Sequence, residues 1–196
     1  MMSWMPNRAE ALALLEQYNQ QDNLRKHALA VEAVMRHFAT LFPGADADEW
    51  GLVGLLHDLD YEKFPEQHCT MTAQILHDLD LEPRLVRAIV SHGYGICSDV
   101  KPESDLEKVL YTIDELTGLV TATALMRPSR SVLDLELKSL KKKFKTPSFA
   151  AGVNRDVVRQ GAEWLGIELD RVLEETIRGM QTAAASLGLA GDIQPS

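Results

Sequence analysis

The sequence has few cysteines and no long apolar run, and each shortage excludes a class of protein. Its two cysteines, Cys69 and Cys97, are too few for a disulfide framework and form no Cys-x-x-Cys motif of the kind found in zinc ribbons. No apolar stretch reaches membrane-spanning length, and the N-terminus lacks the layout of a signal peptide. We therefore expect a soluble, cytoplasmic protein with reduced cysteines and no membrane partner.

Positive charge is also scarce, because 20 Lys and Arg residues stand against 29 Asp and Glu, for a formal net charge of −9. Proteins that bind nucleic acids need a basic face, so no nucleic-acid polymer is expected as a partner. The length of 196 residues and the apolar fraction of 45% suit one globular domain. The sequence leaves the oligomeric state open.

Almost every segment has the apolar periodicity of an amphipathic helix, and no segment has a convincing strand pattern. N-terminal caps and helix breakers divide the chain into nine expected helices. They cover about 7–18, 22–43, 46–58, 65–80, 82–93, 105–126, 131–144, 154–166 and 168–187. The predicted fold class is all-α.

The tetrapeptide His-Asp-Leu-Asp occurs twice, at 57–60 and at 77–80. Adjacent residues on a helix do not face each other, so a His-Asp pair after an apolar run suggests a shared ligand outside the helix. A metal ion would accept both an imidazole nitrogen and a carboxylate oxygen. His57 follows the small Gly54, which lets another helix approach closely, whereas His77 shares a face with polar residues. We predict that His57 and Asp58 are functional and that His77 lies at the surface.

Four further polar residues are expected on inward helix faces, where an unpaired charge would be costly. They are His27, His68, His92 and Asp114. A single inward histidine is more often hydrogen-bonded to the backbone than bound to metal. Together with the His-Asp pair, however, these four make a set of six candidate metal ligands.

The order of these six residues resembles the H…HD…H…H…D pattern of the dinuclear branch of the HD-domain superfamily of metal-dependent phosphohydrolases. The likeness covers about residues 22–121. Within it, the segments FPEQHCTMTAQIL, VRAIVSHGYG and LEKVLYTIDELTG are similar to HD proteins that hydrolyse nucleotides. The resemblance implies an HD-type helical bundle in one domain at 1–190, with the metal-binding core at about 22–121 and a C-terminal helical extension at about 129–188.

The resemblance also implies how two divalent metal ions per chain would be held. The first ion would bind His27, His57, Asp58 and Asp114. Asp58, which is also predicted to be catalytic, would bridge to a second ion bound by His68 and His92. Imidazole and carboxylate donors favour iron or manganese, with cobalt or zinc as alternatives, and exclude a thiolate site. The implied reaction is hydrolysis of a nucleotide or other small phosphate ester by a metal-activated water.

The segment after the His-Asp pair departs from the family pattern. Many HD hydrolases carry a phosphate-binding lysine there, whereas this chain has Leu-Asp-Tyr at 59–61. Lys63 is the predicted replacement, both catalytic and substrate-binding. Further substrate-binding candidates are Arg127, Arg130 and Lys141. Lys141 belongs to a basic cluster at 138–145, which is either a solvated face or a surface that attracts an anionic substrate.

Two other functions fit the same residues. Mixed-valent di-iron oxygenases of the HD superfamily use the same dinuclear pattern with dioxygen, and residue types do not distinguish them from hydrolases. A nucleotide-sensing module that binds without turnover is the third interpretation. The presence of all six ligands counts against that module.

Overall fold

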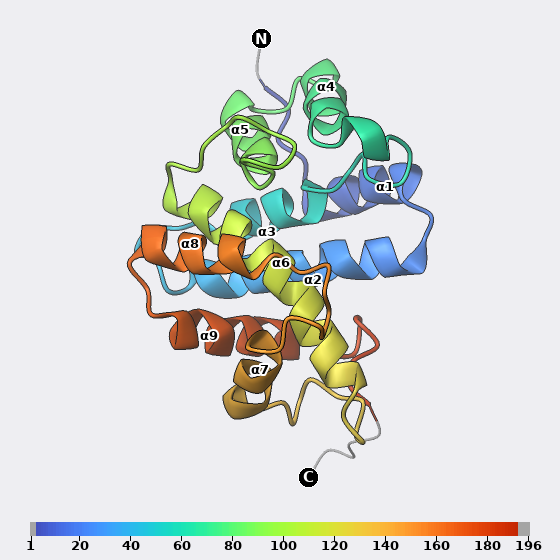
Figure 1. Cartoon of the computed structure of the whole chain (residues 1–196). Helices are drawn as coiled ribbons and strands as arrows, with labels where there is room; N and C mark the ends of the chain where they lie inside the picture. Colours follow the sequence, from blue (N-terminus) through green and yellow to red (C-terminus); the bar gives the residue numbers. More distant parts are fainter. Residues whose placement is uncertain (1–2, 192–196) are drawn as a thin grey trace.

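Residues 3–191, the part of the chain that the computed structural model describes, form nine α-helices and one short 3₁₀ helix, without a strand (Figure 1). The all-α prediction is confirmed for this part of the chain. The elements are α1 (Arg8–Tyr18), α2 (Asp22–Ala39), α3 (Ala47–Leu56), η1 (Pro65–Gln67), α4 (Thr70–Asp78), α5 (Pro83–Ser91), α6 (Asp105–Leu125), α7 (Leu137–Phe144), α8 (Arg155–Leu165) and α9 (Leu169–Thr182). No helix within residues 3–191 is both long enough and apolar enough to cross a membrane.

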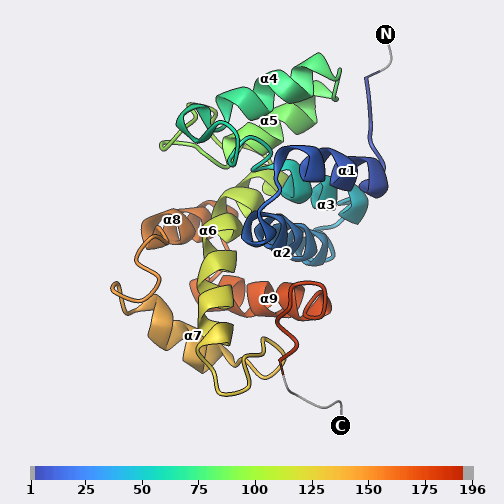
Figure 2. The ribbon, with the colours of Figure 1, turned by 90° about the vertical axis from the view of Figure 1, so that its right-hand side faces the viewer.

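Helix α2 lies in the middle of the molecule, between α3 on one side and α9 on the other (Figures 1 and 2). Its apolar residues Val31, Val34 and Phe38 are completely buried, because residues spaced three and four apart share one helix face. Helix α6 crosses α2 and also contacts α8. Helices α4 and α5 form one end of the molecule and α7 forms the other (Figure 2). One buried apolar cluster includes residues from all these layers, and the predicted domain boundaries remain predictions.

Local capping explains where several helices begin and end. Asn7 and Ser104 each start a helix with a capping box, in which the cap side chain and a glutamate three residues later satisfy each other's backbone N–H groups. Asn154 caps α8, and Gly166, with a left-handed φ of 65°, ends it. These boundaries agree with the sequence prediction because the caps depend only on neighbouring residues.

The helix predicted over 65–80 is interrupted near the centre of the candidate site. Cys69, which separates η1 from α4, has a φ of 67° and cannot continue a right-handed helix. The buried Asp60 carboxylate holds this turn by accepting hydrogen bonds from the Thr72 N–H at 2.8 Å and from His68 Nδ1 at 2.7 Å. The prediction of one continuous helix is wrong because helical periodicity does not reveal such contacts.

Two C-terminal helices are shorter than predicted. Residues 131–136 do not form the first half of a helix, because the Ser131 hydroxyl and the Val132 N–H both donate to the Leu189 carbonyl. Helix α9 ends at Thr182, and the chain then turns so that Leu187 and Leu189 are buried. Both corrections have one cause, which is the pairing of the segment after α9 with the segment before α7.

Candidate metal centre

Residues that follow three helices and residues within two others converge on a cavity of about 460 Å³. His57 and Asp58 follow α3, His68 follows η1, His92 follows α5, and His27 and Asp114 lie within α2 and α6. Five of these six side chains line the cavity, and the sixth, His57, is completely buried. The fold therefore brings together all six residues predicted as metal ligands.

The first group is a compact triad of His27, His57 and Asp114. Asp114 Oδ1 lies 3.0 Å from His27 Nε2 and 3.2 Å from His57 Nε2, and the two nitrogens are 3.2 Å apart. Two donor atoms about 2.1 Å from one ion, at angles between octahedral and tetrahedral, lie roughly 3.0–3.4 Å apart. The triad therefore has the spacing of ligands around a single metal ion.

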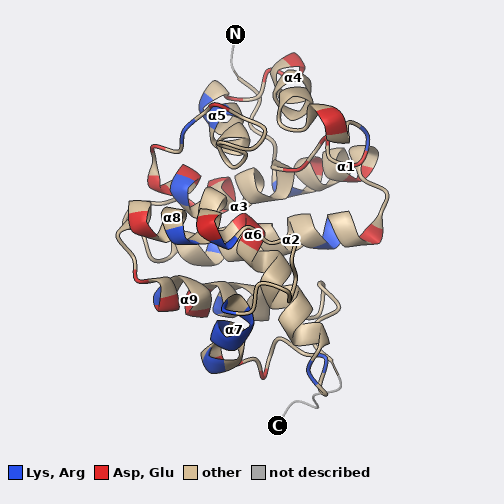
Figure 3. Ribbon diagram, in the orientation of Figure 1, with Lys and Arg blue, Asp and Glu red and all other residues tan. Residues whose placement is uncertain are grey.

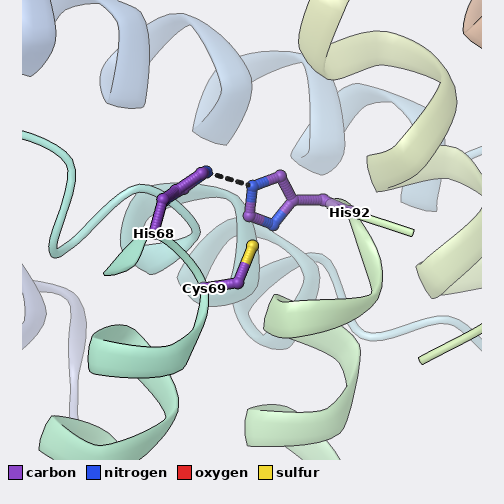
Figure 4. A group of neighbouring side chains, drawn as sticks. All are labelled: His68, Cys69 and His92. Carbon is purple, nitrogen blue, oxygen red and sulfur yellow. Dashed lines mark hydrogen bonds between the residues drawn. The ribbon is translucent and has the colours of Figure 1, made fainter. Parts of the chain in front are cut away.

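The second group contains His68 and His92, whose Nε2 atoms are also 3.2 Å apart (Figure 4). Asp58 lies between the two groups. Its Oδ1 is 3.4 Å from His92 Nε2 and 3.5 Å from His68 Nε2. The same oxygen is 3.4 Å from His57 Nε2, and Oδ2 is 3.5 Å from His27 Nε2. This central position suits a carboxylate that bridges two ions.

Hydrogen bonds at Nδ1 orient the imidazole rings. His57 and His92 each donate from Nδ1 to the carbonyl three residues earlier in the chain, at 2.8 and 2.6 Å. His68 donates from Nδ1 to the Asp60 carboxylate at 2.7 Å. An imidazole with its hydrogen on Nδ1 presents the lone pair of Nε2, which is the arrangement that metal-binding histidines adopt.

The facing nitrogens of His68 and His92 suit a cation between them. Both rings use a hydrogen at Nδ1, so neutral rings direct two lone pairs at each other across 3.2 Å. Such lone pairs repel unless a proton or a metal ion lies between them. Two imidazoles with a carboxylate beside them are typical ligands of a transition metal, so these residues fit a bound ion.

Charged neighbours raise the pKa of two histidines in the site and lower the pKa of two aspartates. Burial by itself would lower the pKa of His57, but the Asp58 and Asp114 carboxylates hold it well above the usual value. Burial would raise the pKa of both carboxyls, but the neighbouring histidines, His57 above all, keep it below the usual range. For His68, the Asp60 and Asp58 carboxylates outweigh burial and raise the pKa. The site is thus an anionic pair of carboxylates that attracts positive charge.

Asp60 belongs to the candidate site, although the sequence did not predict it. Its side chain is completely buried and is shared between His68 Nδ1 and the Thr72 N–H. A carboxylate that accepts from the Nδ1 hydrogen of a metal-binding histidine fixes the orientation of the ring and raises the basicity of its Nε2 atom. The only signal in the sequence was a charged residue close to the buried Leu56 and Leu59.

The prediction of reduced cysteines is wrong in this structure, since Cys69 and Cys97 form a disulfide with Cα atoms 6.1 Å apart. The pairing arises because α4 and α5 pack together, which brings the loop after α5 to the start of α4. The exclusion of a thiolate site remains a prediction, although a sulfur atom lies close to the second group. The Cys69 sulfur and one nitrogen each of His68 and His92 all lie within 4.8 Å of one another.

Lys63, predicted to bind phosphate, does not line the cavity. Its Nζ donates to the Gln17 carbonyl at 2.8 Å and lies 4.6 Å from the centroid of the Tyr18 ring. Among the described residues that line the cavity, none is Lys or Arg, and the acidic ones include Glu115, whose pKa is raised by burial. The catalytic and substrate-binding role of Lys63 remains a prediction.

The other three predicted substrate-binding residues lie beyond the C-terminal end of α6, with Arg127 and Arg130 in the turn after it and Lys141 on α7. Arg127 donates to both oxygens of Asp134, at 3.0 and 2.9 Å, and Lys141 pairs with an aspartate of α9. Arg130 lies in the same turn as Arg127. From Asp114 to the last residue of α6 the helix rises about 16 Å. Figure 3 shows the Lys-rich ribbon of α7 at the end of the molecule away from α4 and α5. This placement favours a solvated basic face, and substrate binding by these residues remains a prediction.

Residues 3–191 thus contain an all-helical fold with two buried histidine-rich groups suited to metal ions. Asp58 lies between the groups, and an aspartate, Asp60, supports one of the histidines. No family model, curated protein or solved structure matches the chain.

Proposed function

We propose that this chain is a metal-dependent phosphohydrolase of the HD-superfamily type, with two divalent ions per chain. The observation that carries the proposal is the position of Asp58, within 3.5 Å of the Nε2 atoms of all four ligand histidines. Two metal ions that share the Asp58 carboxylate would account for this arrangement. Iron or manganese suits such oxygen- and nitrogen-rich shells, and cobalt or zinc is the alternative.

Bound divalent ions supply a nucleophile by lowering the pKa of water, and they neutralise charge on phosphoryl oxygens. The residues of the chain provide the geometry. The Nδ1 hydrogen bonds fix the rings of His57, His68 and His92, so these three side chains are already oriented before substrate binds. The cavity of about 460 Å³ is within the range of small-molecule sites.

The lining of the cavity favours a substrate with one phosphate group. It contains Asp58, Asp114 and Glu115 but, among the described residues, no Lys or Arg. The negative charge of a substrate would therefore have to be met at the metal positions, and a polyphosphate would place further charges against carboxylates. Tyr61 and Tyr111 also line the cavity and offer apolar contacts to the remainder of the substrate. We propose a nucleoside monophosphate or another small phosphomonoester.

Phosphate release from a panel of nucleotides and phosphomonoesters, with Mn(II) or Fe(II) added, tests the proposal. We expect release from at least one monoester and none from the Asp58→Asn variant. The Asp78→Asn variant is the matched control, because Asp78 belongs to the second His-Asp-Leu-Asp copy and is 65% exposed. Tight nucleotide binding without phosphate release would support the nucleotide-sensing module instead.

A mixed-valent di-iron oxygenase is the second candidate function. The absence of Lys and Arg from the described lining of the cavity favours it, because such an enzyme needs no phosphate-binding cation. Electron paramagnetic resonance of the iron-loaded protein distinguishes the two. A stable mixed-valent signal, combined with no phosphate release, would replace the hydrolase proposal.

A further inference from the structure

The disulfide of Cys69 and Cys97 lies directly beside the second group of ligands. Cys69 follows His68 in the chain, and Cys97 lies in the loop after His92. Figure 4 shows the Cys69 side chain directed toward the His92 ring. Its sulfur is within 4.8 Å of a nitrogen of each histidine, which is a ligand-like spacing for an atom that is already bonded to another sulfur.

Two features of the backbone allow the two sulfur atoms to lie beside His68 and His92. A Cβ atom on Gly93 would collide with both sulfur atoms, so the residue after His92 has to be glycine while the pair is present. Cys69 itself has a φ of 67°, a left-handed conformation that costs of order 1–3 kcal/mol for a residue with a side chain. Residues held in such conformations cluster at functional sites and switches.

The two sulfurs differ in access. Cys69 is buried, with 2% of its surface exposed, whereas Cys97 is only half-buried and lines the metal-centre cavity. Both residues also line a neighbouring groove, next to α4, that opens to the surface. A reductant can therefore reach Cys97 without entering the metal centre, and the sulfur that it displaces is Cys69.

We infer that the Cys69–Cys97 pair is a redox switch of the second metal position. A thiol of a small dithiol reductant attacks the Cys97 sulfur, the bond between the cysteines breaks, and Cys69 leaves as a thiolate beside His68 and His92. The second thiol of the reductant then displaces Cys97 from the mixed disulfide. Two electrons pass to the protein, the dithiol becomes a disulfide, and its protons go to Cys97 and to solvent.

The two oxidation states then offer different ligands to the metal. In the disulfide state the second position has His68, His92 and the Asp58 carboxylate. In the reduced state the Cys69 thiolate joins them, and a soft thiolate increases the preference for zinc or cobalt over manganese. This inference rests on the proposed metal binding at His68 and His92, and it adds the redox control of that position.

Cobalt(II) binding to the full chain, before and after treatment with a dithiol, tests the switch. We expect no free thiol in the oxidised protein and two after reduction. We also expect a sulfur-to-cobalt charge-transfer absorption only in the reduced protein, with affinity at the second position higher by at least about tenfold. Cys97→Ser and Cys69→Ser are the matched variants, because each removes the disulfide but only the second removes the sulfur ligand. Cys97→Ser should show the absorption under all conditions, and Cys69→Ser should never show it.

Cobalt bound without this absorption in both reduced wild type and Cys97→Ser would overturn the switch and leave the proposed metal centre intact. Two free thiols after mild oxidation would also overturn it. Failure of both redox states to bind cobalt at all would overturn the metal centre and the switch together. Circular dichroism of the two variants identifies any loss of signal that comes from unfolding.

Discussion

The two copies of His-Asp-Leu-Asp have the same four residues and opposite environments. In the copy at 57–60, the side chains of His57 and Asp60 are completely buried, and Asp58 is 17% exposed. In the copy at 77–80, the side chain of His77 is 84% exposed, and Asp78 is 65% exposed. The first copy forms the candidate metal centre, and the second contributes none of the described residues around the cavity.

The difference comes from what packs over each copy. The first copy follows α3, which lies tightly against α2: a Cβ on Gly54 would come within 3.1 Å of the α2 backbone. This close approach brings the His27 ring to His57. The second copy ends α4, at one end of the molecule, where the following residues form a turn (Figure 2). A tetrapeptide therefore acquires its chemistry only from the helices that cover it.

The largest expected contrast is between Asp58→Asn and Asp78→Asn. Loss of the Asp58 charge removes the carboxylate that both metal positions share, so we expect both ions to be lost in large part. We expect phosphate release to fall by at least about a thousandfold, the equivalent of several kcal/mol of lost stabilisation. Asp78→Asn should behave as wild type. Elemental analysis and initial rates measure both effects, and two retained ions in Asp58→Asn would contradict the bridging role.

The next contrast is between His68→Ala and His77→Ala. His68 belongs only to the second group, so its removal should lower the metal content from two ions per chain toward one. The triad of His27, His57 and Asp114 should keep the first ion, because it is built from helices of the core. His77→Ala should retain both ions. Unchanged stoichiometry in His68→Ala would show that the two-position arrangement is wrong.

Asp60→Asn and Asp80→Asn give a smaller contrast. An asparagine at 60 can accept from His68 or face the Thr72 N–H with its amide oxygen, but it has only one oxygen for two donors. We expect the affinity of the second position to fall about 10- to 100-fold. Asp80 is exposed, so its substitution should leave the affinity unchanged. Metal titration monitored by calorimetry measures the difference, and equal affinities would remove Asp60 from the site.

The smallest expected contrast is in the pH dependence of stability. The Asp58 and Asp114 carboxylates raise the pKa of His57 above the usual histidine value, so in metal-free protein its protonated form adds stability below about pH 6.5. This stability is lost as the pH rises through the pKa of the folded state. The pKa values of Asp58 and Asp114 lie below 3.8, so both carboxyls stay charged throughout that range. The unfolding midpoint of chelator-treated protein should therefore fall as the pH rises.

His57→Gln should remove this pH dependence, and His77→Gln should preserve it. Bound metal takes the place of the proton, so the metal-loaded protein should gain more stability over the metal-free protein as the pH rises. Thermal unfolding followed by circular dichroism measures the pH dependence for metal-free wild type, metal-loaded wild type, His57→Gln and His77→Gln. The same slope in His57→Gln and wild type would mean that other groups cause the dependence.

Much of the fold could be predicted because it depends on neighbouring residues. The capping boxes at Asn7 and Ser104 and the glycine after α8 are local features, and the helices they bound begin and end as predicted. The six candidate ligands could be predicted as inward-facing polar residues on helices with clear apolar faces. Asp60 and the pairing of Cys69 with Cys97 could not be predicted, since their contacts join segments that only packing brings together.

The sequence by itself therefore determined an all-α protein and a set of polar residues on its inner helix faces, because periodicity and caps act over a few residues. The tertiary structure decided which His-Asp-Leu-Asp copy is buried, that the carboxylate of Asp58 stands between two groups of histidines, and that two cysteines meet beside one of them. All three are contacts between different helices and loops. They depend on which elements pack together, and residues distant in the chain set that packing.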